Sequence, residues 1–456
     1  MHLVLINPLS KKSGIGGSKN SNFPPLSLSF IAAVTPPNYR ITIIDENMET
    51  CTYPDADIVG ITGYTSAINR GYQIASKYRE KGVPVVMGGI HVSMLPDEAL
   101  RYCDCVVTGE AEAIWATVLK DFENGALKPV YEGFFADITS LPLPRRDLLT
   151  PNYTWGTLQT SRGCPMACNF CSVSVFNGRQ FRRRLMDDVI SELQQIKQRF
   201  IFLIDDNILG FNKEDRNWLF EFFKRVQKLK PKKYFLAQSS INIGEDPELL
   251  RLANKAGVKT LFVGMESVEG HALESFNKIL NASMLKKNKY YELIKTIRKC
   301  GIGVLGAFML GGDTDTISSF KTTYDFILKS GIDVVQLTKP TPLPGTEFYK
   351  ILDSENRIVN KNYPSAWDDY RFTRMLFKPH NLEVSDVYEG FAWFKLKFFS
   401  WPVKTRRYLR TLFDTKDIFT AFMVIKLNNA YEVAFRSSEL FGYFDMAILI
   451  EKFDKK

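Results

Sequence analysis

The sequence predicts an α/β protein that is built from three parts. Short apolar runs alternate with helical patterns as far as residue 346, which is typical of parallel sheets covered by helices. After residue 385 only helical periodicity continues, and this stretch is rich in Phe, Trp and Tyr. We therefore predict a doubly wound domain over residues 1–140, a partial (β/α)6 barrel over 150–346 and a mainly helical C-terminal region over 347–456.

The N-terminal part is predicted to contain five parallel strands, and ligands of such sheets bind beyond the carboxyl ends of the strands. The strands are expected at 3–6, 41–44, 58–62, 83–87 and 105–108, with helices such as 67–81 and 111–123 between them. Glycines and small polar residues follow these strands, and they would let a large flat ligand approach the backbone. These residues are Asn7, Pro8, Tyr64, Thr65, Ser66, Gly88, Gly89, His91, Gly109 and Glu110. The same residue types are also ordinary turn residues, and spacing alone favours neither interpretation.

The middle part follows a predicted linker at residues 125–150, which is rich in Gly and Pro. Strands are expected at 157–161, 200–205, 234–239, 259–264, 303–310 and 333–338. Helices are expected at 185–199, 213–229, 246–257, 286–300 and 316–330. Six such βα units predict a curved partial barrel, whose active residues would lie at the carboxyl ends of the strands.

Three cysteines follow the first strand of this barrel, at Cys164, Cys168 and Cys171. A disulfide would leave one thiol over, and a structural zinc site would need a fourth ligand that the neighbouring sequence lacks. An iron–sulfur cluster fits better, with three irons held by thiolates and one iron left open. An open position on a metal implies that a further molecule binds there.

This CxxxCxxC spacing, with the aromatic Phe170 before the last cysteine, resembles the radical S-adenosylmethionine (SAM) superfamily. The resemblance implies that SAM chelates the open iron through its amino and carboxylate groups. An electron from the cluster would then cleave SAM to a 5′-deoxyadenosyl radical. An electron donor such as flavodoxin or ferredoxin is also implied.

Polar residues and glycines end the later strands, where the resemblance places SAM-binding groups. Asp205, Asp206 and Asn207 follow the second strand and could equally be a helix cap. Ser239, Glu266 and Ser267 could meet a ribose or a carboxylate, although a structural ion pair is the competing account of Glu266. The missing side chain of Gly306 would let an adenine lie close to its strand, and Pro342 makes a rigid turn at the same rim.

The N-terminal part resembles the cobalamin-binding domain that precedes the radical SAM domain in many enzymes. The resemblance rests on Asn7-Pro8, on Pro24-Pro-Leu26, on the run from Gly88 to Leu100 and on Val107-Thr-Gly-Glu110. It implies that the strand-end residues of this part bind cobalamin. The Asp-x-His-x-x-Gly signature is missing, because no Asp lies two residues before His91, and this weakens axial ligation by a histidine. Asp205-Asp-Asn207, Gly264-Met-Glu-Ser267 and Thr341-Pro-Leu-Pro-Gly-Thr346 resemble one cobalamin-binding branch, which includes hopanoid methylases and the anaerobic protoporphyrin-ester cyclase; this resemblance covers residues 1 to about 380.

The charge and cysteine content allow several partners and favour one compartment. The net charge is +9, the chain has seven cysteines, and it shows neither a signal peptide nor a membrane-spanning segment, so a reducing cytoplasm is expected. The basic run 179–184 is interpreted as structural, although it could hold a SAM carboxylate, a corrin amide or an anionic substrate. Basic residues between 395 and 416 predict either contact with a membrane surface or an ordinary packed helix. No nucleic-acid-binding module is recognisable.

The resemblance implies a radical SAM enzyme with a 4Fe-4S cluster, SAM and cobalamin as cofactors. The predicted reaction is methylation of an unactivated carbon in a hydrophobic or lipid-like small molecule. A radical cyclisation or rearrangement with the same cofactors is the second hypothesis. A third is an iron–sulfur electron-transfer or binding protein, and the SAM-like strand ends count against it.

Overall fold

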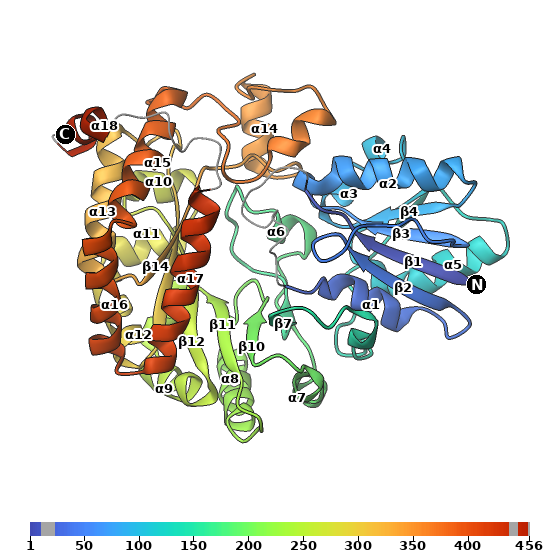
Figure 1. Cartoon of the computed structure of the whole chain (residues 1–456), viewed down its shortest axis with the longest axis horizontal. Coiled ribbons are helices and arrows are strands. Elements are labelled where there is room, and N and C mark those ends of the chain that lie inside the picture. Colours follow the sequence, from blue (N-terminus) through green and yellow to red (C-terminus); the bar gives the residue numbers. More distant parts are fainter. Residues whose placement is uncertain (11–22, 437–445, 455–456) are drawn as a thin grey trace.

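The first part of the chain is an open, wholly parallel sheet with helices on both faces (Figure 1). The computed structural model describes residues 1–10, 23–436 and 446–454. The strand order is β2-β1-β3-β4-β5-β6. The strands are β1 His2–Asn7, β2 Arg40–Asp45, β3 Ile58–Thr62, β4 Val85–Gly88, β5 Cys105–Thr108 and β6 Val130–Glu132. The short edge strand β6 was expected to be linker, because Pro129 and Gly133 on either side of it signal a turn.

Two layers of helices bury the apolar faces of this sheet. Helices α1 Leu26–Val34 and α5 Trp115–Glu123 cover one face, where Leu5 packs against Leu28 and Val118. Helices α2 Ile68–Glu80, α3 Ile90–Met94 and α4 Pro96–Ala99 cover the other face. The strands of this sheet are buried on both faces, and for that reason their sequences are continuous apolar runs. This is what the sequence predicts for a doubly wound domain.

The second part is a six-stranded parallel sheet in the order β14-β13-β12-β11-β10-β7, which confirms the predicted partial barrel. Its strands are β7 Trp155–Leu158, β10 Phe200–Leu203, β11 Tyr234–Ser239, β12 Val258–Glu266, β13 Gly303–Met309 and β14 Val334–Thr338. The outer helices are α7 Met186–Gln195, α8 Lys213–Val226, α9 Pro247–Ala256, α12 Tyr290–Lys299 and α13 Ile317–Ser330. Further short helices at the carboxyl edge are α6 Val173–Phe176, α10 Gly270–Ser275, α11 Ile279–Lys286 and α14 Glu347–Ser354.

The first predicted barrel strand is divided in two. After β7 the chain leaves the sheet, and β8 Ser161–Arg162 pairs instead with β9 Arg182–Arg183 in an antiparallel ribbon. This β8–β9 ribbon closes both ends of the cysteine loop. The divided strand therefore gives the loop a support of its own at the edge of the barrel.

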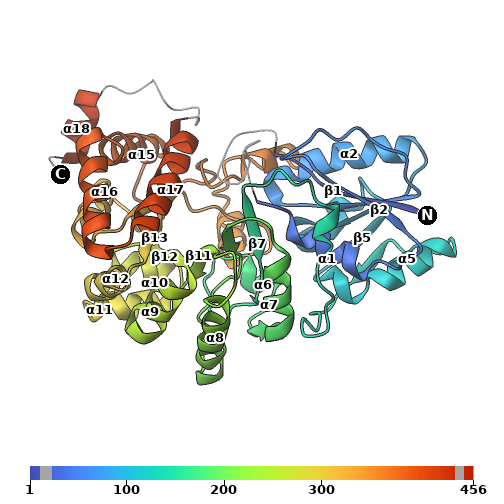
Figure 2. The same cartoon turned by 60° about the horizontal axis from the view of Figure 1, so that its bottom comes forward.

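The C-terminal helices pack on the barrel and partly fill it. They are α15 Val384–Phe398, α16 Trp401–Thr415, α17 Ile418–Arg436 and α18 Met446–Asp454. Figure 2 shows these helices (red) beside the barrel and far from the first sheet. Met423, Val424 and Leu427 of α17 pack against Leu305 and Val334 on the inner face of the sheet. Over the described residues, no helix combines the length and the hydropathy that a membrane crossing requires.

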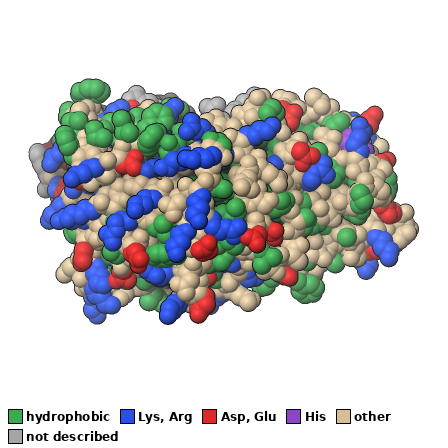
Figure 3. Space-filling view, turned by 90° about the horizontal axis from the view of Figure 1, so that it is seen from below, with side chains coloured by type: hydrophobic (Ala, Val, Ile, Leu, Met, Phe, Trp, Pro, Cys, Tyr) green, Lys and Arg blue, Asp and Glu red, His purple; other side chains and the backbone are tan. Residues whose placement is uncertain are grey.

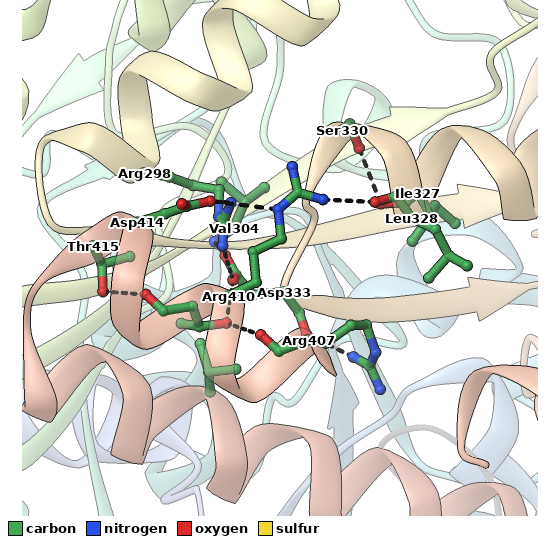
Figure 4. A network of polar contacts seen from close by, with 12 residues as sticks. Arg298, Val304, Ile327, Leu328, Ser330, Asp333, Arg407, Arg410, Asp414 and Thr415 are labelled. Atoms are coloured by element: carbon green, nitrogen blue, oxygen red, sulfur yellow. Dashed lines mark hydrogen bonds and ion pairs between the residues drawn. The ribbon is translucent and has the colours of Figure 1, made fainter. Parts of the chain in front are cut away.

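A buried polar network fixes α16 to the start of β14 (Figure 4). The Asp333 carboxylate accepts hydrogen bonds from Arg298 Nη2 at 3.0 Å, the Val304 amide at 2.8 Å and Thr411 Oγ1 at 2.5 Å. The Arg407 guanidinium donates to the Asp333 carbonyl at 2.8 Å. Removal of one partner from such a buried network would leave an uncompensated charge, so α16 is held rigidly.

Candidate functional site

The cysteine loop begins at a turn that only glycine can make. Gly163 has a φ of +89°, and a Cβ atom there would overlap the carbonyl oxygen of Gln180. The next amide, that of Cys164, donates to the carbonyl of Gly178 at 3.2 Å. The β8–β9 ribbon thus fixes the point at which the loop leaves the barrel.

The far side of the loop is fixed by helix α10 and the residues that follow it. The Asn169 amide donates to the carbonyl of Phe276 at 3.2 Å, and Asn277 Nδ2 donates to the carbonyl of Ala167 at 2.7 Å. The rings of Phe170 and Phe276 meet edge to face, with their centroids 5.5 Å apart. Phe170, predicted to contact SAM, therefore lies within this support.

The donor set of the loop fits an iron–sulfur cluster better than a single metal ion. Cys164, Cys168 and Cys171 are free and partly buried on one loop. Within the described residues, no three His, Cys, Asp or Glu side chains are gathered as the ligands of a single ion. The thiolates of a cluster bind separate irons and need not converge in that way. Burial raises the pKa of the Cys171 thiol to about 11, and bound iron would favour its thiolate.

The structure bears out the ion pair that the sequence offered as the competing account of Glu266, and the pair lies beside these thiols. Lys278 Nζ is 2.7 Å from Glu266 Oε1, and burial of the lysine opposes its charge. The carboxylate of Glu266 and the thiols of Cys168 and Cys171 nevertheless raise the pKa of Lys278 above its ordinary value. Glu266 ends β12 with a φ of +60°, where the register of the strand shifts. Chain spacing gives no sign of Lys278, because helix α10 separates it from Glu266.

The three polar residues after β10 all have hydrogen-bond partners within the protein. The Asp205 carboxylate is fully buried and accepts hydrogen bonds from Thr160 Oγ1 at 2.6 Å and Ser161 Oγ at 2.5 Å. Asn207 is bonded to Ser240, at 3.1 Å from Nδ2 to Oγ. Asp206 accepts a hydrogen bond from Asn177 Nδ2 of the cysteine loop at 3.3 Å, and burial raises its pKa to about 6. Contact with SAM stays a prediction for all three residues.

The other residues predicted to contact SAM lie at the ends of β11 and β12, within β13 and in the loop after β14. Ser239 and Ser267 are buried at the carboxyl ends of β11 and β12. The missing side chain of Gly306 makes room for Ile332 and Phe308 on the helix-covered side of the sheet. The reason given for that glycine, close approach of an adenine, is therefore not the one that the structure shows. Pro342 is buried in the loop after β14, close to Gly345, where a Cβ atom would overlap Met94 of the first domain.

The carboxyl edge of the first sheet carries the predicted cobalamin-binding residues. Tyr64 is 62% exposed, yet the surrounding protein desolvates its hydroxyl and raises its pKa. Ser66, close to Tyr64 in the chain, is partly buried. Asn7 is buried, and its side-chain amide donates to Asp45 Oδ1 at 2.8 Å; Pro8 is the next residue. Cobalamin contact by these residues stays a prediction.

Two glycines of this edge, Gly89 and Gly109, have steric reasons that do not require a ligand. Gly89 has a φ of +97°, and a Cβ atom there would lie 2.9 Å from the Gly63 nitrogen. Gly109 has a φ of +69° and lies directly against the backbone of Gly133. Gly88 ends β4, and a Cβ atom there would lie 3.4 Å from the carbonyl oxygen of Val107, an ordinary contact.

His91 uses both ring nitrogens inside the protein. Its Nε2 lies 3.3 Å from Glu98 Oε1, and its Nδ1 lies 3.2 Å from Thr65 Oγ1. Burial lowers the pKa of His91, so the ring is neutral, with Nε2 donating to the carboxylate and Nδ1 accepting from the hydroxyl. Neither nitrogen remains for a cobalt ion. His91 therefore supports the edge, in agreement with the missing histidine signature.

Glu110 joins the first domain to the support of the cysteine loop. Its carboxylate accepts from Arg182 Nη1 at 3.0 Å and is also bound by Arg182 Nη2. Arg162 Nη1 lies 3.2 Å from Glu110, and its Nη2 donates to Glu112 at 2.6 Å. Burial would raise the pKa of Glu110, but the two guanidinium groups lower it. These buried ion pairs connect the predicted cobalamin edge directly to the β8–β9 ribbon.

Arg183 and Arg184 of the basic run also have internal partners, which supports its structural interpretation, whereas Arg179 is exposed. Arg183 Nε lies 3.1 Å from Asp215, and Arg184 Nη1 lies 2.5 Å from Glu192. The run therefore holds the ribbon to α7 and α8. It does not present a row of free cations to a ligand.

Comparison with known proteins shows relatives of the same organisation. Residues 158–327 match the model of the radical SAM superfamily, and residues 16–119 match the model of the B12 binding domain. The chain is 29% identical over 394 residues to the bacteriochlorophyllide d C-8(2)-methyltransferase of Chlorobaculum tepidum, covering 81% of this chain and 83% of that protein. It is 27% identical over 376 residues to the hopanoid C-2 methylase of Rhodopseudomonas palustris, covering 79% and 69%.

A solved structure shares the fold. The radical S-adenosylmethionine methyltransferase TsrM of Kitasatospora setae, with cobalamin and a 4Fe-4S cluster bound, superposes with a TM-score of 0.63 at 15% identity. The match covers 78% of each chain. The predicted cofactor classes, an iron–sulfur cluster, SAM and cobalamin, agree with both matched domains.

Proposed function

Because this chain belongs to the cobalamin-binding radical SAM superfamily, we propose that it transfers a methyl group to an unactivated carbon of a hydrophobic, lipid-like substrate. One observation carries the proposal most directly. The Glu110 ion pairs with Arg162 and Arg182 hold the predicted cobalamin edge against the β8–β9 ribbon, from which the cysteine loop extends. Two cofactors that act on one substrate need this kind of fixed proximity.

We propose that Cys164, Cys168 and Cys171 hold the cluster, and that the Lys278–Glu266 pair orients SAM beside it. The pair presents one ammonium and one carboxylate, which complement the carboxylate and amino groups of SAM. When bound, the cluster and SAM supply an organic radical, and cobalamin supplies a methyl group. Phe170 and Phe276 provide apolar surface that keeps water from the loop.

The remaining parts of the proposal concern substrate and partners. The names of two relatives, which specify methyl transfer to a bacteriochlorophyllide and to a hopanoid, support a hydrophobic substrate. A protein such as flavodoxin or ferredoxin would supply the electron. The cytoplasmic location, with peripheral contact at a membrane, stays a prediction.

Anaerobic turnover tests this proposal. Protein reconstituted with iron, sulfide and hydroxocobalamin should cleave SAM to 5′-deoxyadenosine, and it should pass a label from the SAM methyl group into a product of lipid extract. The Cys171→Ala variant should lose cleavage by more than a hundredfold, since the cluster has no substitute ligand nearby.

The outcomes separate the competing functions. Failure of the intact cluster to cleave SAM would contradict both enzymatic hypotheses. Cleavage with bound cobalamin but without transfer of label would favour cyclisation or rearrangement. Cleavage without any binding of cobalamin would remove the basis for methyl transfer.

A further inference from the structure

The amino-terminal edge of the barrel is strongly basic. Outer helices return to the strands at this edge through short turns, and exposed lysines and arginines gather in these turns and in the helix ends beside them. They are Lys197, Arg199, Lys228, Lys230, Lys232, Lys255, Lys299 and Lys329. Among the described residues none of them forms an ion pair, and the one carboxylate in these turns, Asp333, is buried against Arg298. We name this surface the amino-edge face.

The basic stretch of the C-terminal region contributes little to this charge. Arg407 is buried, Lys404 is 2.8 Å from Glu432, and Lys397 is 2.6 Å from Asp454. Most cations of the stretch that the sequence singled out at 395–416 are therefore buried or ion-paired, whereas Arg406 and Lys416 are exposed. Most exposed cations of this region belong to the barrel turns of the amino-edge face.

Large apolar side chains lie beside these cations, where α16 ends and α17 begins. They include Leu412, Phe413, Ile418, Phe419 and Phe422, which are 41%, 70%, 71%, 50% and 45% exposed. The ring of Phe419 stacks on Tyr234 at 4.8 Å, and Tyr234 begins β11 at the amino edge. Figure 3 looks onto this side of the molecule: Lys and Arg (blue) spread across the barrel, and hydrophobic side chains (green) gather at the upper left.

The fold holds this apolar surface outward. The Asp333 network anchors α16 from beneath, and Lys259 Nζ binds Asp417 at 2.5 Å just before α17 begins. The helix ends are therefore fixed parts of the barrel. Exposed apolar groups on a rigid support, with cations beside them, mark an interaction site.

We propose that the amino-edge face docks on the surface of an anionic lipid bilayer. Unpaired cations attract anionic headgroups, and exposed Phe and Ile side chains insert at the boundary with the acyl chains. A nucleic acid would use the cations but would leave Phe413 and Ile418 in water. A second copy of the chain would bring two basic faces together, which repulsion opposes.

Co-sedimentation of the full chain with vesicles tests the proposal. The chain should bind vesicles of phosphatidylcholine with phosphatidylglycerol in preference to pure phosphatidylcholine, and binding should weaken at high salt. The triple variant Lys228→Gln, Lys230→Gln, Lys232→Gln should lower the binding constant on the order of a hundredfold. Its matched control is Lys213→Gln, Lys286→Gln, Lys287→Gln, which removes the same charge near the carboxyl edge and should leave binding unchanged.

A second pair of variants tests the apolar contribution. Phe413→Ser, together with Ile418→Ser, should lower binding at least tenfold and leave circular dichroism unchanged. The control is Phe134→Ser, a side chain of the first domain that is 74% exposed. Equal loss in a control, equal binding to neutral vesicles, or binding to heparin without vesicles would overturn the proposal. Lipid binding needs no cofactor, so its failure is distinguishable from failure of methyl transfer.

Discussion

At the scale of single residues, the Lys278–Glu266 pair is the most informative feature of the site. It lies beside Cys168 and Cys171, and those thiols and Glu266 together keep the lysine charged despite its burial. A charged pair of this kind is stable only while both partners remain. The two groups of the pair can each face the opposite charge of a zwitterionic ligand, and the Lys278 ammonium places a positive charge beside Cys168 and Cys171.

Replacement of Lys278 should weaken SAM binding, and it also leaves the Glu266 carboxylate without this buried partner. We predict that Lys278→Met raises the Kd for SAM by tenfold or more, because a charged hydrogen bond is worth about 1.5–3 kcal/mol. It should also lower the reduction potential of the cluster, because a nearby positive charge is lost. Calorimetric titration of reconstituted protein and a redox titration followed by electron paramagnetic resonance measure the two effects.

The control for this prediction is Lys286→Met, an exposed lysine of the same region. It should change neither value. A Lys278→Met variant with normal SAM affinity and normal potential would show that the pair is only structural.

At the scale of elements, the β8–β9 ribbon connects the two domains. Arg182 of this ribbon binds Glu110, and Arg162 binds Glu110 and Glu112. The cysteine loop is the connection between the two strands of the ribbon, so a shift of the first domain would move the loop as well. The ribbon therefore couples the predicted cobalamin edge to the cluster.

Removal of one partner from this ion network should lower the free energy of unfolding more than removal of two partners. We predict that Glu110→Gln lowers the free energy of unfolding by about 3–5 kcal/mol, because two guanidinium groups then lack part of their compensation. The double variant Glu110→Gln, Arg182→Met should recover part of that loss. Denaturation followed by circular dichroism measures both, and additive losses would contradict the coupling.

The sequence predicts the elements better than it predicts their partners. Buried parallel strands such as β13 show as apolar runs, and the cysteine loop shows as a motif of local spacing. Strand β6 is missed because it is short and lies between Pro129 and Gly133. Partners far apart in the chain leave no local pattern, so the bonds of Arg182 to Glu110 could be seen only in the structure.

At the scale of the whole molecule, a segment of the predicted C-terminal region completes the core of the first domain. Trp367, Tyr370 and Leu376 pack with the residues that α2 and α3 bury, although they follow the barrel in sequence. The segment contains the 3-10 helix η5 Ser365–Asp369, which lies against η1 Thr65–Ala67 at the predicted cobalamin edge. The orange ribbon that reaches the first domain in Figure 1 follows this path.

The centre of this contact is the Glu98 carboxylate. It accepts from Trp367 Nε1 at 3.0 Å and from Tyr72 OH at 2.8 Å, and it lies 3.3 Å from His91 Nε2. Burial opposes its charge, but hydrogen bonds from His91, Trp367 and Tyr72 lower the pKa of Glu98. The ring of Trp367 also stacks on Tyr363, with centroids 3.9 Å apart. One buried carboxylate thus joins the barrel extension to the edge that would hold cobalamin.

Loss of the Trp367 donor should loosen this contact and leave both sheets intact. We predict that Trp367→Phe, which keeps an aromatic ring but removes the N–H group, costs about 1–3 kcal/mol because Glu98 loses a buried partner. Hydrogen exchange measured by mass spectrometry should become on the order of tenfold faster in residues 64–69 and 363–371, with the strands unchanged. Trp401→Phe makes the same chemical change at a side chain that is 77% exposed and should alter neither segment. Faster exchange in residues 363–371 alone would contradict this prediction. It would mean that the Trp367–Glu98 hydrogen bond orders the η5 segment but does not order residues 64–69 at the predicted cobalamin edge.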